Sequence, residues 1–212
     1  MDTDKIKLNL RAYYDKEAEL RNKGGKQDWK KKEREFFCAR AKNESKADLL
    51  EIGAGTGQDS LYFMQRGFNV TAINFSGEMV RICREKSINA SVMDFYDIAN
   101  LGRTYHCIWA MNCLLHVPKP DLHKVLCGIN AVLSDGGLFF MGVYGGADIE
   151  REKTDLAICD MPRFFSFYSE SSLKGLLADI FDILAFRQYS IGGTYDFQSV
   201  TMRKKRSSGS FE

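Results

Sequence analysis

A buried strand that runs directly into three closely spaced glycines constrains this chain more than any other feature. The stretch LLEIGAGTGQDSLYF, residues 49–63, begins with apolar side chains typical of a parallel strand and ends in helical spacing. Gly53, Gly55 and Gly57 allow positive φ angles and let ligand atoms approach the backbone. The dinucleotide-binding fingerprint has its third glycine three residues after the second, where this chain has Gln58. The turn therefore predicts a ligand lying across the strand ends, and not a pyrophosphate at a helix N-terminus.

Strand-like and helical segments alternate after about residue 45. Five apolar runs fit buried strands, at residues 47–52, 68–74, 89–93, 104–111 and 137–143. Helical spacing lies between them, at residues 57–66, 76–87 and 120–133. The sequence Ser134-Asp-Gly-Gly137 predicts a turn before the fifth strand. Such alternation builds βαβ units, so the region predicts a parallel sheet with helices on both faces.

The last part of the chain departs from this alternation. After a predicted helix at residues 169–179, two strand-like runs at 181–188 and 195–203 are joined by Ile191-Gly-Gly193. This connection is too short for a parallel crossover, so the two strands must be antiparallel. The expected fold is therefore α/β, with a parallel sheet that is completed by an antiparallel hairpin.

The two ends of the chain are more highly charged than its centre. Helical spacing occurs at residues 4–22 and 28–41, with a break at Gly24-Gly25. We expect residues 1–45 to form an N-terminal helical cap or lid and residues 46–203 to form the main domain. The tail at residues 204–212 is basic and serine-rich, and we expect it to be disordered.

Length, charge and composition limit the classes of protein to which the chain can belong. At 212 residues it can bury one full core, and a net charge of +2 does not indicate a nucleic-acid partner. No apolar run reaches the roughly 18 residues of a membrane span, and the polar N-terminus does not resemble a signal peptide. The six scattered cysteines fit reduced thiols in a cytoplasmic protein. With only three histidines, we expect no metal site.

Polar and aromatic residues follow the predicted strands at the edge of the sheet where ligands bind. In an open parallel sheet this edge is formed by the carboxyl ends of the strands. In strand order, the residues there are Glu51 with Gly53–Gln58, Asn74 with Phe75, Asp94 with Phe95, Asn112–His116, and Tyr144–Gly146. Hydrogen-bonding groups beside flat apolar faces suit a nucleoside.

This ordered set resembles that of class I S-adenosylmethionine-dependent methyltransferases over roughly residues 45–203. It comprises E-x-G-x-G-x-G after the first strand, a polar residue closing the second, Met-Asp-Phe after the third, and the terminal antiparallel hairpin. The segments VTAINFSGEMV and FYDIANLGRTYHCIWAMNCLLHVP are similar to the corresponding stretches of small bacterial members. The resemblance implies a Rossmann-like doubly wound sheet of seven strands, parallel except for the last antiparallel strand, and S-adenosylmethionine as cofactor.

The resemblance also implies roles for individual residues. The cofactor-binding residues would be Glu51, Gly53, Gly55, Gly57, Gln58, Asn74, Phe75, Asp94, Phe95 and Asn112. The glycines would lie against the methionine part, and Asp94 would accept from the adenine amine. Asn74 departs from the family pattern, which usually has an acidic residue there to accept from both ribose hydroxyls. Because an amide offers one acceptor and a donor, we expect binding to survive, weaker by about 1 kcal/mol.

Catalytic and substrate-binding residues are predicted at the same edge. His116 follows the fourth strand and is the expected general base. Substrate contacts are expected from Tyr14, Tyr144, Arg163 and Phe165, and the segment 145–162 would form a lid above the fifth strand. Each has a structural alternative: His116 could only pack or cap the helix that follows it, and aromatic residues with this spacing are as often part of a core.

The predicted activity is transfer of a methyl group from S-adenosylmethionine to an O or N nucleophile, with a small molecule as acceptor. Methylation of RNA or protein is one alternative, favoured only by the basic clusters Lys30–Lys32 and Arg203–Arg206. A non-catalytic S-adenosylmethionine-binding protein is another, which Asn74 permits. The glycine spacing disfavours a nicotinamide-binding protein.

Overall fold

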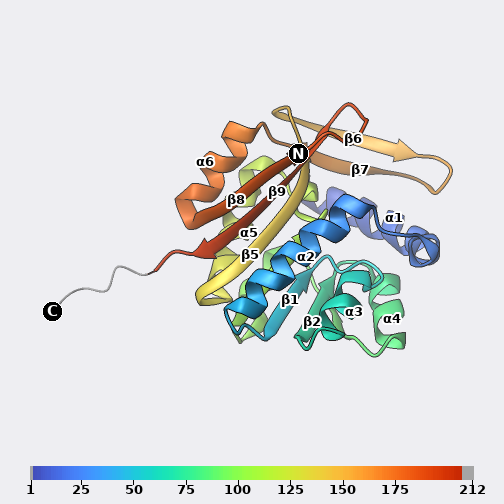
Figure 1. Ribbon diagram of the computed structural model, residues 1–212. Coiled ribbons are helices and arrows are strands. Elements are labelled where there is room, and N and C mark those ends of the chain that lie inside the picture. The colour runs from blue at the N-terminus through green and yellow to red at the C-terminus, as the bar shows by residue number, and fades with distance from the viewer. Residues whose placement is uncertain (1, 207–212) are drawn as a thin grey trace.

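The computed structural model describes residues 2–206 and is built around a seven-stranded sheet (Figure 1). The order of its strands is β3-β2-β1-β4-β5-β9-β8. These strands are β1 (Asp48–Ile52), β2 (Asn69–Asn74), β3 (Asn89–Val92), β4 (Tyr105–Met111), β5 (Leu133–Gly145), β8 (Phe181–Tyr189) and β9 (Asp196–Lys204). The helices are α1 (Thr3–Lys23), α2 (Asp28–Asn43), α3 (Gln58–Met64), α4 (Gly77–Glu85), α5 (Lys119–Ala131) and α6 (Glu170–Ile180). Two short 3₁₀ helices follow β3 and β4, at Phe95–Leu101 and Leu114–His116.

The direction of the strands confirms the predicted fold class. Strands β3, β2, β1, β4 and β5 are parallel, and β9 is antiparallel to both β5 and β8. From β1 the chain proceeds outward through β2 and β3, and from β4 it proceeds outward in the other direction. The carboxyl ends of β1 and β4 therefore form the topological switch point, where open α/β sheets bind ligands.

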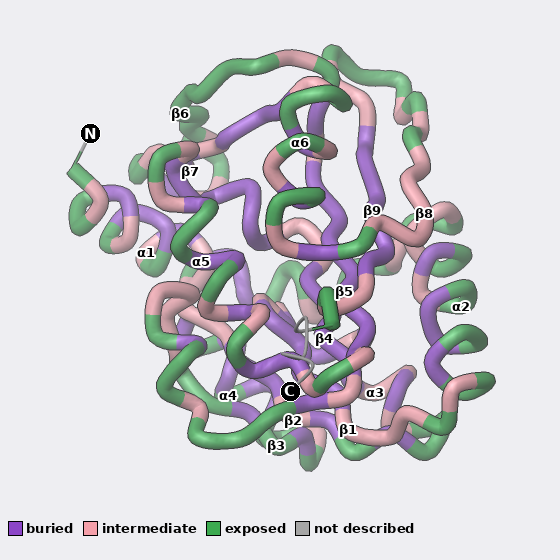
Figure 2. The backbone as a smooth tube through the Cα atoms, turned by 90° about the vertical axis from the view of Figure 1, so that its left-hand side faces the viewer, coloured by how far each residue is buried: buried purple, intermediate pink, exposed green. Residues whose placement is uncertain are grey.

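Helices cover both faces of the sheet. On one face, Phe37 of α2 packs on Trp109 of β4, whose ring stacks on Phe140 of β5 with the ring centres 3.9 Å apart. Helices α3 and α4 lie on this face too, while α5 and α6 pack against the opposite face. Figure 2 shows that the central strands β1, β4 and β5 are buried along most of their length.

The two N-terminal helices occupy different places. Helix α2 belongs to the layer that covers the sheet, through Phe37 and Ala41. Helix α1 lies over the carboxyl ends of the strands, where Leu10 packs on Phe164 of β7 and Ala18 packs on Met79 of α4. Within the predicted cap of residues 1–45, α1 is therefore the part that covers the switch point, and the division at residue 45 stays a prediction.

The segment after β5 that was expected to form a lid folds as a separate two-stranded sheet. Strand β6 (Ile149–Asp155) pairs antiparallel with β7 (Cys159–Phe167), and β7 packs along α1 (Figure 1). The sequence of β6, IEREKTD, is polar and almost wholly exposed, so it lacks the alternation of apolar residues that indicates a strand. In β7, Phe164 and Ser166 are buried on one face and anchor the hairpin.

The start of β5 also differs from the expected boundary. Its pairing with β4 begins at Leu133, four residues before the predicted strand, and the register shifts before Leu138. Gly136 has φ +66° within this irregular stretch. The predicted turn at residues 134–137 is thus a bulge inside a longer strand, because pairing resumes on both sides of it.

The C-terminal end is described only in part. Strand β9 ends at Lys204, which is the first residue of the tail predicted to be disordered, and residues 207–212 lie outside the described part of the chain. Among residues 2–206, no helix combines the length and the apolar character that crossing a membrane requires.

Candidate functional site

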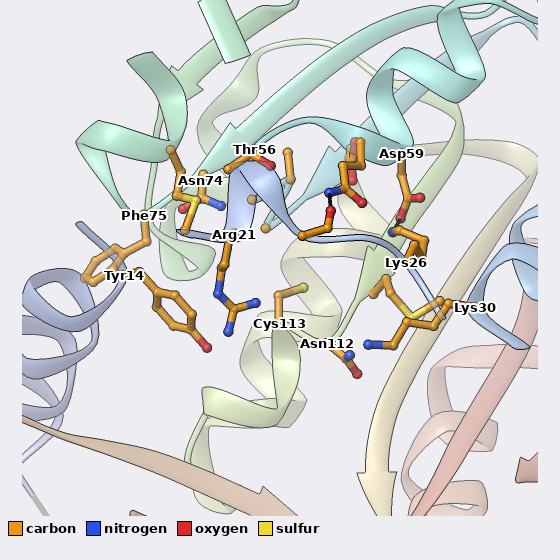
Figure 3. A pocket seen from close by; sticks show the side chains of 18 of the residues that line it. Tyr14, Arg21, Lys26, Lys30, Thr56, Asp59, Asn74, Phe75, Asn112 and Cys113 are labelled. Carbon is orange, nitrogen blue, oxygen red and sulfur yellow. Dashed lines mark hydrogen bonds and ion pairs between the residues drawn. The ribbon is translucent and has the colours of Figure 1, made fainter. Parts of the chain in front are cut away.

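A cavity of about 290 Å³ lies at the switch point, beneath α1 and the segment that joins α1 to α2. Its volume is near the lower end of the range for ligand pockets, roughly 300–1,000 Å³. Figure 3 shows side chains converging on it from α1, from the glycine turn after β1 and from the residues after β2 and β4.

The cavity brings together most of the residues expected to bind the cofactor. Those that line it are Glu51, Gly53, Gly55, Gln58, Asn74, Phe75, Phe95 and Asn112. Gly57 and Asp94 do not line it. Gly57 has φ +81°, a conformation that favours glycine, and a Cβ atom there would lie 2.3 Å from Cδ1 of Ile88. The Asp94 carboxylate lies 2.8 Å from Nζ of Lys7 and accepts from the Tyr96 N–H, so it is bound to the chain itself.

The glycine turn holds the backbone close to the cavity. Gly53 and Gly55 have φ +68° and +55°, a region that favours glycine. The N–H groups of Gly53 and Ala54 both donate to the Ile73 carbonyl of β2, at 2.9 and 3.1 Å. A Cβ atom at Gly55 would meet no atom within 4 Å, so the turn leaves open space there.

One end of the cavity is aromatic. Phe75 follows β2, Phe95 follows β3, and both rings line the wall. Asn74 lies beside them, and its Oδ1 atom accepts from the N–H of Ser76 at 2.9 Å. The Nδ2 group of Asn74 carries two further hydrogens that can donate.

The other end of the cavity is positively charged and rests on a buried carboxylate. Lys26 and Lys30 line this end, whereas Arg21 lies nearer the aromatic end, beside Tyr14 (Figure 3). Asp59 of α3 is 3% exposed and lies 2.6 Å from Nζ of Lys26 and 2.9 Å from Nη1 of Arg34. Burial alone would raise the pKa of Asp59, but these two cations and the N–H of Trp109 outweigh it and lower the pKa.

Glu51 lies close to Asp59, but its pKa is shifted in the opposite direction. Burial, followed by the negative charge of Asp59, raises the pKa of Glu51, although Ser60 donates a hydrogen bond to it. Lys30 has its pKa lowered to about 8 by burial and by the neighbouring cations Lys26 and Arg21. Within residues 2–206, Lys30 forms no ion pair with a carboxylate. The cationic end can therefore accept an anionic group.

These cationic residues were largely missed by the sequence reasoning. The sequence indicates Lys30 only as part of the basic cluster Lys30–Lys32, and no motif singles out Arg21 or Lys26. The break at Gly24-Gly25 was the available signal, because the chain turns there and the Gly24 carbonyl accepts from Nε2 of Gln58 at 2.8 Å. That contact holds the segment over the glycine turn.

The predicted base His116 lies at the cavity wall between α1 and β7. Its Nε2 atom is 2.7 Å from the hydroxyl oxygen of Tyr14, and its Nδ1 atom is 2.6 Å from the carbonyl oxygen of Phe164. The side chain is 6% exposed, and its pKa is lowered to about 4. Burial is the main cause, the bond to Phe164 opposes it, and the positive charges of Arg163 and Arg21 add to it.

Of the predicted substrate residues, only Tyr14 lines the cavity. Phe165 lies behind His116, with ring centres 4.9 Å apart, and Arg163 lies 4.1 Å from the ring centre of Tyr13. The Tyr144 ring packs on Phe197 of β9, with the ring centres 5.9 Å apart. Asn112 has φ +56°, and its buried Oδ1 atom has no hydrogen-bond partner within the described chain.

The shifted pKa of His116 predicts a pH-dependent stability. Because its pKa falls from 6.5 in the unfolded chain to about 4 in the folded one, the unfolded chain binds the proton more tightly. This contribution is fully present above pH 6.5 and is lost as the pH falls toward 4. Between pH 7 and pH 5 we expect it to lower the free energy of unfolding by about 2 kcal/mol.

Urea unfolding at both pH values would measure this loss. His116→Gln should reduce the pH dependence by that amount, whereas the exposed His123→Gln should leave it unchanged. Equal slopes for wild type and His116→Gln would show that His116 titrates normally.

Comparison with known proteins assigns the chain to a family. The chain matches the family described as methyltransferase domain over residues 24–180, and it belongs to that family. This membership confirms the resemblance found in the sequence. Among the described residues 2–206, no group of three or more His, Cys, Asp or Glu side chains is arranged to hold a metal ion.

Individual relatives are more distant. The C-methyltransferase NovU of Streptomyces niveus is 26% identical over 100 residues, which are 45% of this chain and 23% of NovU. A malonyl-[acyl-carrier protein] O-methyltransferase of Pectobacterium atrosepticum is 34% identical over 95 residues, 45% of this chain and 34% of that protein. The matched region thus spans less than half the length of either relative.

A solved structure extends the similarity to nearly the whole chain. It is the 1,6-didemethyltoxoflavin-N1-methyltransferase of Burkholderia thailandensis, with 1,6-didemethyltoxoflavin and S-adenosylhomocysteine bound. It superposes with a TM-score of 0.72 at 18% identity and covers 97% of this chain and 92% of that one. At this identity the likeness shows a shared fold.

Proposed function

We propose that the protein transfers a methyl group from S-adenosylmethionine to an oxygen or nitrogen atom of a small molecule. The observation that carries the proposal is the cavity at the switch point, which is aromatic at one end and cationic at the other, with the glycine turn between them. Family membership supports it, and so does the S-adenosylhomocysteine bound to the structurally similar Burkholderia enzyme.

The residues present fit this cofactor. Phe75 and Phe95 would hold the adenine, and Asn74 would donate to a ribose hydroxyl. The open space at Gly55 would admit the methionine part against the backbone, and Lys30 would hold its carboxylate. The cofactor supplies a methyl group on a positively charged sulfur, which is already activated toward a nucleophile.

The chain's own residues would align the acceptor and manage its proton. Tyr14, Asn112 and His116 all line the cavity, and the hydroxyl of Tyr14 and the neutral imidazole of His116 are hydrogen-bonded to each other there. A site of this kind orients a nucleophile by hydrogen bonds and can accept a proton from an O–H or N–H group. Its cover by α1 and its volume favour a small acceptor over a macromolecule.

Thermal unfolding with candidate ligands tests the cofactor. At a concentration about 100 times the dissociation constant, S-adenosylmethionine or S-adenosylhomocysteine should stabilise the chain by about 2.7 kcal/mol and raise Tm by roughly 5–10 °C. NAD should have no such effect. Stabilisation by NAD alone would overturn the proposal.

A labelled-methyl transfer screen then separates the acceptor classes. We expect label to appear in the small-molecule fraction of a cell extract. Label found only in the RNA or protein fraction would mean that the methyl acceptor is a macromolecule. Tight S-adenosylhomocysteine binding without any methyl transfer would identify a non-catalytic binding protein.

A further inference from the structure

The hydrogen bonds of His116 leave neither ring nitrogen free for an acceptor molecule. Nε2 faces the Tyr14 hydroxyl of α1 at 2.7 Å, and Nδ1 faces the Phe164 carbonyl of β7 at 2.6 Å. A base whose nitrogens are both bonded within the chain cannot take a proton directly from the cavity.

These two bonds fix the tautomer of the ring. A carbonyl oxygen can only accept, so Nδ1 carries a hydrogen and donates it to Phe164. The lowered pKa keeps the ring neutral near pH 7, so Nε2 has no hydrogen and accepts from the hydroxyl of Tyr14. Tyr14 is therefore the donor in this pair.

The oxygen of Tyr14 then keeps its lone pairs for the cavity. Figure 3 shows Tyr14 projecting from α1 beside Arg21 and toward Cys113. The charged groups that act on this oxygen are Arg21 and Glu17 from α1 and Arg163 from β7. Burial raises the pKa of Tyr14 while the two arginines oppose that rise, and the net rise keeps the resting hydroxyl protonated.

We propose that Tyr14 is the catalytic residue that receives the proton of the acceptor, and that His116 is the positioning residue that takes the proton of Tyr14 in the same step. This proposal rests on the proposed function, because it requires an acceptor bound in the cavity. It changes the role predicted for His116, which acts through the tyrosine and not by contact with the acceptor.

The relay is balanced without any further reactant. The O–H or N–H bond of the acceptor breaks, its proton forms a new O–H bond on Tyr14, and the original hydroxyl proton forms an N–H bond on His116 Nε2. The acceptor keeps the electron pair of the broken bond, with which it would form its bond to the methyl carbon. The bond between that carbon and the sulfur of the donor would break, and its electron pair would stay on the sulfur, which becomes neutral. No group is oxidised or reduced. The imidazolium left on His116 returns its proton to Tyr14 and from there to solvent after the product leaves.

Kinetics of matched variants test the relay once the transfer screen has supplied an acceptor. Tyr14→Phe removes the hydroxyl, and His116→Gln keeps a donor and an acceptor but cannot take the proton. Each should lower kcat by about 10²-fold or more, and the double variant should be no slower than either single variant, because the two residues act as one unit. Tyr13→Phe is the matched control, since Tyr13 faces Glu17 on the same helix, and it should keep wild-type kcat.

The pH profile distinguishes a relay from a merely structural role. Wild-type kcat should be level between pH 6 and pH 8, whereas kcat of both variants should rise about tenfold per pH unit as the acceptor ionises by itself. Variants that are slow but level with pH would overturn the proposal, as would wild-type kcat in Tyr14→Phe.

A measurement without turnover separates this proposal from the proposed function. In ¹⁵N-histidine NMR of the chain saturated with S-adenosylhomocysteine, His116 should show hydrogen on Nδ1 and none on Nε2 at neutral pH. Hydrogen on Nε2 would overturn the relay even if methyl transfer is found. Failure of S-adenosylhomocysteine to bind, measured by calorimetry, would overturn the proposed function and the relay with it.

Discussion

Replacing Asp59 with alanine is expected to lower the free energy of unfolding by about 3–5 kcal/mol. The carboxylate is buried and pairs with Lys26 and Arg34, and it accepts from Nε1 of Trp109 at 3.0 Å. Its removal leaves two cations and an N–H group in the interior without their carboxylate, and the penalty for burying charges that lack a counter-ion is large.

Urea unfolding at pH 7 measures the loss. The matched control is Asp28→Ala, because the Asp28 side chain is 87% exposed and pairs only with Lys31 on its own helix. That variant should change stability by less than about 1 kcal/mol. If Asp59→Ala unfolded at the same urea concentration as Asp28→Ala, water would have to reach Lys26 and Arg34 and replace the carboxylate.

Alanine substitutions at the first two glycines of the turn should fail in different ways. At Gly53, a Cβ atom would lie 2.3 Å from Cβ of Cys113, and φ is +68°. Strain and overpacking together should lower stability by about 2–5 kcal/mol. At Gly55 nothing lies within 4 Å, so only the strain of φ +55° remains, about 1–2 kcal/mol.

Gly55→Ala should therefore fold and instead lose ligand affinity, since its methyl group would occupy the space left for the cofactor. Chemical unfolding and calorimetry with S-adenosylhomocysteine measure the two effects separately. Gly55→Ala with undiminished affinity would place the ligand elsewhere in the cavity, and Gly53→Ala with wild-type stability would mean that Cys113 can move aside.

The sheet was predictable because its signals are local. The apolar runs of β1, β2 and β4 are buried on both faces and read as continuous hydrophobic strands. The short connection before β9 required an antiparallel pair. Strand β6 had no such signal, since its charged side chains stay in solvent and its pairing depends on β7.

The residues of the candidate site were likewise predictable only where their signals are local. Asn74, Phe75 and Asn112 were found because the carboxyl ends of parallel strands meet at one edge. Lys26 and Lys30 reach the cavity only because the segment before α2 is held down by Gln58 and Asp59, a contact between distant positions that no local pattern encodes. The position of Asp94 was predicted after β3, but its pairing with Lys7 depends on where α1 lies.

Helix α1 lies wholly outside the part of the chain that matches the family. The family match begins at residue 24, and Tyr14 and Arg21 precede it. A protein that began at residue 24 would keep every strand of the sheet and the whole glycine turn. It would lose the helix that covers the cavity, the hydroxyl group bonded to His116 and the guanidinium of Arg21. Conservation measured only inside the matched region would therefore omit Tyr14, the residue proposed to receive the proton of the acceptor.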